Sequence, residues 1–369
     1  MSRPSFDIFC KVIDNFGDIG VCWRLARQLA NMPEPHRVRL WVDDLNAFRR
    51  IEPRLDPHAR LNTLDGIEII HWALPLPDLT PHSVVIEAFA CDPPAEFIAR
   101  MVKQGSLWIN LEYLSAEPWV ASCHALPSLQ ANGLRKIFFF PGFTTATGGL
   151  LREQNLLQQR DDWLANPAQR KALLHHIGLP PTHIDAVLNG AKQILLFAYP
   201  QAPAASLLQA LNKQATPSVM LVPAGVCPTL PRGQHGQVYV HDMPFVSQTE
   251  FDHLLWSSDL NCVRGEDSLV RALWAGKPML WHIYPQDDEA HMTKLQAWLD
   301  LAPFKPGIAS LIQAWNEHDA PACDKLLEQA FAPFCWAQWQ ADISTWSQQL
   351  AQQPSLSDAL VAFCQQASL

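Results

Sequence analysis

The sequence has no run of about 18 or more apolar residues, the length at which a segment can be read as a transmembrane helix. Its first residues, MSRPSFDIFCKV, lack the basic, apolar and small-residue blocks of a secretory signal peptide. Positive charge is scarce, because 27 Lys and Arg stand against 36 Asp and Glu and give a formal net charge of -9. That balance argues against nucleic-acid binding by charge. We therefore expect a cytoplasmic protein that binds neither membrane nor nucleic acid.

Several chemical signatures are also missing. The nine cysteines are an odd number and include no C-x-x-C pair, which argues against a disulfide framework or a zinc site. Most lie among apolar residues, as buried reduced thiols do. The sequence contains no G-x-G-x-x-G, no G-x-x-x-x-G-K-[ST] and no G-x-S-x-G. These absences weaken dehydrogenase, P-loop and hydrolase interpretations.

The chain is long enough for two domains, since 369 residues exceed what one hydrophobic core usually serves. Strand-like runs alternate with helical stretches up to residue 140, a helical segment follows at 152–176, and the alternation restarts at residue 193. Most intervening pieces are too long for hairpins, so parallel strands with crossovers are expected. The strand-like runs lie at 5–13, 38–42, 67–72, 84–89, 107–111, 136–140, 193–199, 218–222, 238–241 and 279–283.

The stretch LNCVRGEDSL, residues 260–269, indicates a buried strand that breaks into a polar loop and then a helix. In an open α/β sheet such a junction lies at the ligand-binding edge, so Arg264, Glu266, Asp267 and Ser268 are expected to gather there. Asp267 and Ser268 are good N-cap residues, and the free amides of a helix start favour an anion. The alternative is an ordinary strand-to-helix turn with a capping side chain.

A second polar junction, DNFGDIG, separates the first strand from an amphipathic helix at 21–30. Asp14, Asn15, Gly17, Asp18 and Gly20 place two carboxylates and two permissive glycines on one connection, as a substrate loop would. Alternatively, Asp18 simply caps the helix.

Two further acids, Glu87 and Glu112, fall at or near strand ends. Each can face a cleft or take a hydrogen-bonded structural role.

Four stretches together resemble the family of protein-arginine rhamnosyltransferases that modify bacterial elongation factor P (EF-P). They are VIDNFGDIGVCWRLARQLA, LLFAYP, MPFVSQTEFDHLLW and RGEDSLVRALWAGKP. The resemblance covers essentially the whole length, and the last stretch matches the family's R-x-E-D-S motif without departure. It implies an α/β GT-B glycosyltransferase fold, with two Rossmann-like domains facing a central cleft. We expect domains at 1–182 and 183–350, with helix 351–369 packing back on the first.

The same resemblance implies an inverting enzyme. It would move L-rhamnose from dTDP-β-L-rhamnose to an arginine side chain of EF-P and so activate that factor for rescue of ribosomes stalled at polyproline. No metal or other cofactor is implied. Two alternatives remain: a GT-B enzyme with another nucleotide sugar or acceptor, and a non-catalytic nucleotide-sensing module. Carboxylates in the first domain favour catalysis over sensing.

Residue roles follow from the matching motifs. Asp14 and Asp18 would be the acidic pair of the first domain, with Asp18 as the base. Phe245 can stack on thymine and Gln248 can donate to and accept from its polar edge. The full set is Asp18, Asp14 and Glu266 for catalysis, Phe245, Gln248, Arg264, Asp267, Ser268 and Tyr199 for the donor, and Asn15, Gly17 and Gly20 for the loop.

Overall fold

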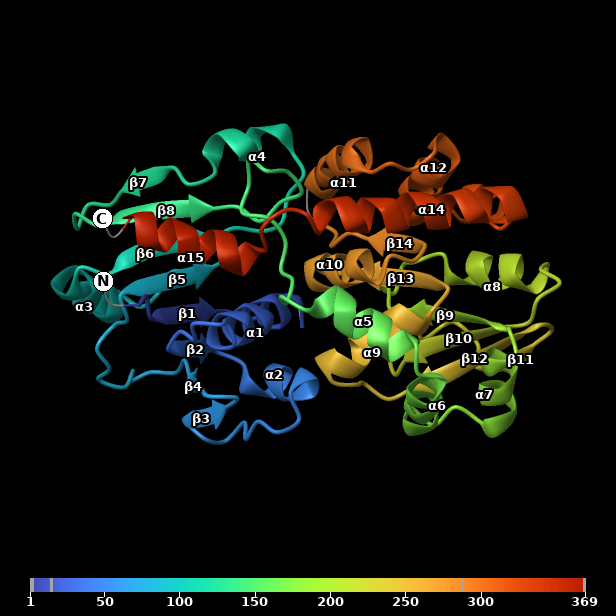
Figure 1. The fold of residues 1–369 in the computed structure, drawn as a ribbon, viewed down its shortest axis with the longest axis horizontal. Coiled ribbons are helices and arrows are strands. Elements are labelled where there is room, and N and C mark those ends of the chain that lie inside the picture. Colours follow the sequence, from blue (N-terminus) through green and yellow to red (C-terminus); the bar gives the residue numbers. More distant parts are fainter. Residues whose placement is uncertain (1–2, 14–15, 287–288, 368–369) are drawn as a thin grey trace. The chain divides into compact units, whose positions relative to one another are not determined.

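The computed structural model describes residues 3–13, 16–286 and 289–367, and the chain forms two compact units (Figure 1). The first unit comprises Met1–Gln154 and Ala351–Leu369, and the second comprises Asn155–Leu350. Each unit contains one largely parallel β-sheet with helices. The predicted α/β class is therefore confirmed. Asp14 and Asn15 lie outside the described residues.

The first sheet has the strand order β3-β4-β2-β1-β5-β6-β8-β7, and its two edge strands are antiparallel to their neighbours. Its strands are β1 Phe6–Cys10, β2 Val38–Val42, β3 Leu61–Leu64, β4 Ile67–His71, β5 Val84–Ala88, β6 Leu107–Leu111, β7 Pro127–Leu129 and β8 Arg135–Phe139. The helices of this unit are α1 Gly17–Ala30, α2 Leu45–Ile51, α3 Ala95–Gln104, α4 Pro118–Cys123 and α15 Leu356–Ala367.

Both faces of this sheet are covered, so every residue of its central strands β1, β2 and β5 is buried, and most of them are apolar. Ile8 of β1 belongs to a core shared with Leu25 of α1 and Leu360 of α15. The next residue, Phe9, points to the opposite face, where it stacks on Trp41 with ring centroids 5.0 Å apart. Figure 1 shows α15, coloured red, beside the strands of this unit.

The second sheet has the strand order β11-β12-β10-β9-β13-β14. Its strands are β9 Lys192–Leu196, β10 Ser218–Pro223, β11 Gly233–His235, β12 Val238–Met243, β13 Leu260–Arg264 and β14 Met279–His282. The helices of this unit are α5 Leu156–Leu164, α6 Pro167–His176, α7 Pro181–Leu188, α8 Ala204–Asn212, α9 Gln248–Ser257, α10 Gly265–Ala275, α11 Ala290–Leu301, α12 Pro306–Asn316, α13 Ala320–Ala330 and α14 Pro333–Leu350.

Each sheet has one point at which the strand order reverses. In the first sheet β1 lies between β2 and β5, and in the second β9 lies between β10 and β13. The connections leaving the two strands at such a point diverge, so ligands of open α/β sheets bind there, at the carboxyl ends. The stretches that follow β1, β9 and β13 therefore lie where such a sheet binds a ligand.

The boundary between the units differs from the predicted one, because residues 155–182 belong to the second unit. Two side chains of α5 hold them there. Nη1 of Arg160 donates to the carbonyl of Trp274 at 2.7 Å, and Trp163 stacks on His253 with centroids 4.8 Å apart. The expected helix at 152–176 is also divided into α5 and α6, because Pro167 lacks the N–H that a continuous helix needs and instead begins α6.

The sequence interpretation missed the three short antiparallel strands β3, β7 and β11. The turn between β3 and β4 is Asp65-Gly66, and both residues have positive φ, 52° and 79°. Asp-Gly is the pair that favours such a two-residue hairpin turn. In the described part of the chain, no helix has the length and apolarity needed to cross a membrane.

Candidate functional site

Asp18 lies in the first turn of α1, directly beyond the end of β1. Helix α1 begins at Gly17 rather than at residue 21, and its N-cap residue, Phe16, makes no side-chain capping bond. The N–H of Ile13 donates to Oδ2 of Asp18 at 2.8 Å, and Asp18 is only 3% exposed. The capping alternative for Asp18 is therefore wrong, since its carboxylate instead ties the strand end to the helix start.

A neighbouring acid braces the same connection. The N–H of Val12 donates to Oδ1 of Asp43, which follows β2, at 2.9 Å. Two carboxylates, one from the first turn of α1 and one from the end of β2, thus accept from consecutive residues of one loop. Asp43 offers a matched comparison for Asp18, because it makes the same kind of bond.

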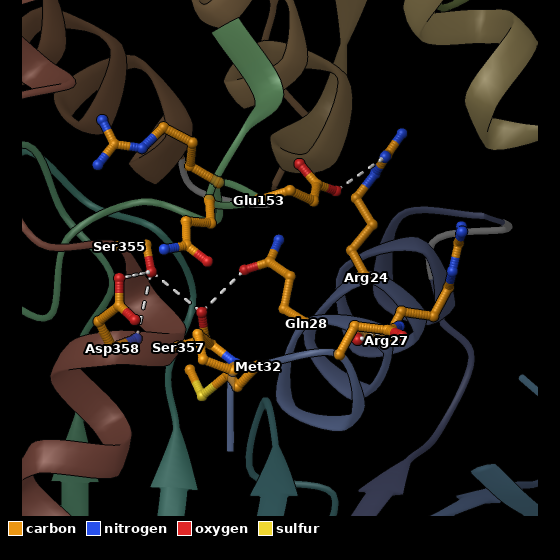
Figure 2. A pocket seen from close by; sticks show the side chains of 12 residues that line it. Arg24, Arg27, Gln28, Met32, Glu153, Ser355, Ser357 and Asp358 are labelled. Carbon is orange, nitrogen blue, oxygen red and sulfur yellow. Dashed lines mark hydrogen bonds and ion pairs between the residues drawn. The ribbon is translucent and has the colours of Figure 1, made fainter. Parts of the chain in front are cut away.

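A cavity of about 240 Å³ lies further along α1, lined by Arg24, Gln28 and the start of α15 (Figure 2). In Figure 2, Ser357 points to Gln28, and its Oγ donates to Oε1 of Gln28 at 3.0 Å. Gln28 is ten residues after Asp18, a rise of about 15 Å along a helix. The cavity is therefore a junction between α1 and α15 and not the surroundings of Asp18.

The two other acids of the first unit have structural partners. Glu87 is fully buried, with Oε1 2.7 Å from Nζ of Lys136, and Nε1 of Trp108 donates to its Oε2 at 3.2 Å. Burial raises the pKa of Glu87, and the Lys136 ammonium opposes that rise. Glu112 accepts from Nδ2 of Asn110 at 2.5 Å.

In the second unit, β13 runs directly into α10, which begins at Gly265. The N-cap position is Arg264, without a side-chain cap, so the predicted capping by Asp267 or Ser268 is wrong. Gly265 has φ +67°, a left-handed value that a side chain would oppose. Oγ of Ser268 accepts from the N–H of Arg264 at 3.1 Å and donates to its carbonyl oxygen. The side chain of Ser268 therefore stabilises the turn through bonds to the backbone of Arg264.

The guanidinium of Arg264 lies over two aromatic rings that follow β9. Its Cζ is 4.5 Å from the ring centroid of Phe197 and 4.9 Å from that of Tyr199. Its Nη1 also donates to the carbonyl of Ala198 at 3.4 Å. A guanidinium fixed on aromatic faces at the reversal point of a sheet can bind the oxygens of an anion.

The loop after β12 carries Phe245 and leads into α9, which begins at Gln248. Ser247 and Glu250 form a capping box at this helix start. Phe251, one turn beyond Gln248, packs edge-on against Phe197 at 5.3 Å. Through Phe197, the first turn of α9 and Arg264 therefore belong to one neighbourhood.

The two acids of the R-x-E-D-S stretch lie in the first turn of α10. Oε1 of Glu266 is 2.8 Å from Nζ of Lys294 on α11. Asp267 is partly buried and lies where the helix dipole favours a negative side chain. Among the described residues, no three His, Cys, Asp or Glu side chains are grouped as a metal site would be.

Comparison with known proteins decides the family. Residues 6–365 match the sequence model described as Elongation-Factor P (EF-P) rhamnosyltransferase EarP. The chain belongs to this family. It is 45% identical to a protein-arginine rhamnosyltransferase of Pseudomonas putida, an alignment that covers 98% of both chains.

Solved structures agree with this EarP membership. One, described as the structural basis for EarP-mediated arginine glycosylation of translation elongation factor EF-P, is 33% identical, covers 100% of both chains and has a TM-score of 0.64. The spinosyn rhamnosyltransferase SpnG is 11% identical, with a TM-score of 0.51 over 98% of this chain and 100% of that one, which concerns the fold alone. The predicted GT-B glycosyltransferase fold is confirmed, and this EarP-family chain is an enzyme.

Sequence reasoning did not single out Phe197, Lys294 or His282, which contact or pair with the candidate residues Arg264 and Glu266 of this EarP-family chain. Phe197 lies in the LLFAYP stretch, two residues before Tyr199, and the sequence predicted there only a strand-like run. Lys294 and His282 come from other elements and reach the site only through the fold. No local pattern marked them.

Proposed function

We propose that this chain transfers L-rhamnose from dTDP-β-L-rhamnose to an arginine side chain of elongation factor P, with inversion at the anomeric carbon. The proposal rests on one observation, the family match over residues 6–365. Because the acceptor would be a translation factor, the reaction would take place in the cytoplasm. The modified factor would then act on ribosomes stalled at polyproline.

The second unit would bind the donor at the carboxyl ends of β9, β12 and β13. Phe245 would stack on thymine and Gln248 would pair with its polar edge, while Tyr199 would line the same pocket. Arg264, Asp267, Ser268 and the N-terminal amides of α10 would hold the diphosphate and ribose. What supports this is the guanidinium of Arg264 above Phe197 and Tyr199 at the helix start, a combination suited to a charged leaving group.

Asp18 would act on the acceptor. A guanidinium has a pKa above about 12, so a carboxylate cannot deprotonate it before reaction. As the attacking nitrogen bonds to the sugar carbon it becomes more acidic, and Asp18 would take the proton at that stage. Asp14 would help to hold the donors of the guanidinium. The bond from Ile13 to Oδ2 would keep the Asp18 carboxylate in one orientation.

Glu266 would act at the donor edge through its ion pair with Lys294. The pair can keep a lysine charge near the diphosphate while Glu266 faces the sugar. Loss of either partner would then raise the barrier to departure of dTDP.

We further propose that the reaction needs no metal ion, because Arg264, Lys294 and the α10 amides supply positive charge at the leaving group. A chelator such as EDTA should leave turnover unchanged. Loss of turnover in EDTA that Mg²⁺ restores would contradict this part.

The proposed reaction is tested by measuring dTDP release from dTDP-rhamnose with and without EF-P. Release should require EF-P and should stop once the acceptor is consumed. A nucleotide sensor would bind dTDP-rhamnose and release nothing under either condition. Faster release from another nucleotide sugar would identify a different donor.

A further inference from the structure

His282, the last residue of β14, lies among the donor-site candidates although no motif marks it. It is 1% exposed and pairs in register with Arg264 of β13. Residues in register on adjacent parallel strands point to the same face of a sheet. The His282 and Arg264 side chains therefore share one face at the carboxyl edge.

The His282 ring is hydrogen-bonded to a second imidazole. Its Nε2 lies 3.2 Å from Nε2 of His318, which follows α12. One of these nitrogens must carry a hydrogen and the other must accept it. Burial, and then the neighbouring His318, lower the pKa of His282 to about 3, and burial also lowers the pKa of His318. The contact is thus a bond between neutral rings at neutral pH.

The His282 ring also contacts Tyr199. The two rings meet edge to face with centroids 5.2 Å apart and an interplanar angle of 80°. Tyr199 is also the ring beneath Arg264, at 4.9 Å. Tyr199 therefore contacts both Arg264 and His282, and His282 is in turn hydrogen-bonded to His318.

The backbone around His282 is braced on both sides by one side chain. Nδ2 of Asn316 donates to the carbonyl of Trp281 at 2.7 Å, and its Oδ1 accepts from the N–H of Ile283 at 2.9 Å. Trp281 itself donates from Nε1 to the carbonyl of Gly265 at 2.8 Å, which joins β14 to the turn after Arg264.

His318 has a backbone conformation that side chains rarely adopt. Its φ is +57°, in the left-handed region, which costs on the order of 1 kcal/mol for a residue with a Cβ. Strained backbone persists where the surroundings hold it, and it gathers at functional sites. Here the residue with this backbone, His318, is itself exposed and contacts a buried imidazole.

We propose that His282 is a positioning residue of the donor site, which, held by His318, keeps the Tyr199 ring against Arg264. This inference rests on the proposed function, because the placement of Tyr199 and Arg264 matters only if both contact the nucleotide. His282 acts through Tyr199 and is assigned no contact with the reacting atoms. Loss of this positioning should therefore weaken donor binding and leave the rate of the chemical step unchanged.

The first test replaces the exposed partner, which puts the fold at little risk. His318→Phe keeps a ring but removes the hydrogen bond, and we expect the KM for dTDP-rhamnose and the Kd for dTDP to rise by about 2- to 10-fold, the net value of one neutral hydrogen bond. kcat should stay within about 2-fold, as expected when binding alone is lost. His318→Gln, which can donate or accept, should restore most of the affinity.

A matched control exists in the same unit, where His183 stacks on Tyr239 with centroids 3.6 Å apart, away from the donor residues. His183→Phe should leave KM, Kd and kcat unchanged. If His183→Phe and His318→Phe had equal effects, the response would be a general loss of packing, and the inference would be wrong.

The route through Tyr199 is tested by a double-mutant cycle. In a Tyr199→Ala background, His318→Phe should change the Kd for dTDP by less than about 2-fold, because the ring that it positions is gone. Additive effects would overturn the inference, as would an unchanged Kd in His318→Phe alone. Failure of the wild-type protein to bind dTDP would instead refute the proposed function, and the inference with it.

Discussion

Arg271 of α10 and Asp252 of α9 form a buried two-point ion pair, with Nε 2.9 Å from Oδ1 and Nη2 2.7 Å from Oδ2. Both side chains are almost fully enclosed. The two helices that it joins begin at Gln248 and Gly265, where the donor candidates lie. The pair therefore fixes the spacing of the two halves of the proposed donor site.

Removal of one partner should be costly, because the other charge stays buried without compensation. We expect Arg271→Ala to lower the free energy of unfolding by about 3 to 5 kcal/mol. Urea unfolding of the full chain measures it. The double variant Arg271→Met/Asp252→Leu should recover much of the loss, and Lys213→Ala, which breaks an exposed pair with Glu328, should have little effect. A small loss in Arg271→Ala would mean that the pair is not a major constraint.

The role of Asp18 can be tested with little change of shape. Asp18→Asn keeps an oxygen for the N–H of Ile13 but cannot take a proton, so turnover should fall by about 100-fold or more. Titration with dTDP-rhamnose should remain like wild type, because the donor residues belong to the other unit.

Asp43→Asn is the matched control, since Asp43 accepts from Val12 of the same loop. It should retain near-normal turnover. Near-normal turnover in Asp18→Asn would instead point to Asp14, Glu112 or another acid as the base.

The donor residues predict a loss of nucleotide affinity. Phe245→Ala should weaken dTDP binding by about 1 to 3 kcal/mol through lost base stacking. Arg264→Ala should cost about 1.5 to 3 kcal/mol, the scale of a hydrogen bond to a charged group. Calorimetric titration decides, with Phe334→Ala, an exposed aromatic of α14, as the control. Unchanged affinity in both variants would place the nucleotide elsewhere.

Acid should destabilise the fold through its buried histidines. Burial lowers the pKa of His82, His124 and His253, and lowers that of His282 to about 3. In the unfolded chain these rings take up protons near pH 6.5, whereas in the folded chain they take up protons only at lower pH. The contribution of these histidines to the free energy of unfolding is thus fully present above about pH 6.5. It falls as the pH drops toward the folded pKa values, by at most about 1.4 kcal/mol per pH unit for each ring.

Urea midpoints at several pH values between about 7.5 and 5 measure this slope. His82→Phe should make the slope shallower, because one buried titrating ring is removed. Replacement of exposed His58 should leave it as it was. A free energy of unfolding that rose on acidification would contradict this prediction.

The sequence predicted the central strands well because their mostly apolar residues reflect burial on both faces. Val38–Val42 and Leu107–Leu111 form strands with the expected bounds. Strand β3 of the edge hairpin was not predicted, although the Asp65-Gly66 turn is a strong local signal. The reason is that β3 alternates exposed and half-buried residues and has no apolar run.

The sequence pointed to candidate site residues only where they lie in a recognisable stretch. Arg264, Glu266 and Ser268 belong to one stretch, and the strand-to-helix junction that this stretch forms keeps them close in space. The contact of His282 with His318 joins residues 36 positions apart. The position of Phe197 beneath Arg264 depends on the pairing of β9 with β13. Only the folded sheet brings these side chains into one neighbourhood.

The most direct measurement is the intact mass of elongation factor P after incubation with this protein and dTDP-rhamnose, followed by fragmentation to locate the change. We predict a gain of one deoxyhexosyl group on a single arginine, and no gain when the Asp18→Asn protein is used over the same time. An unchanged mass, or a sugar attached to any residue other than arginine, would contradict the account.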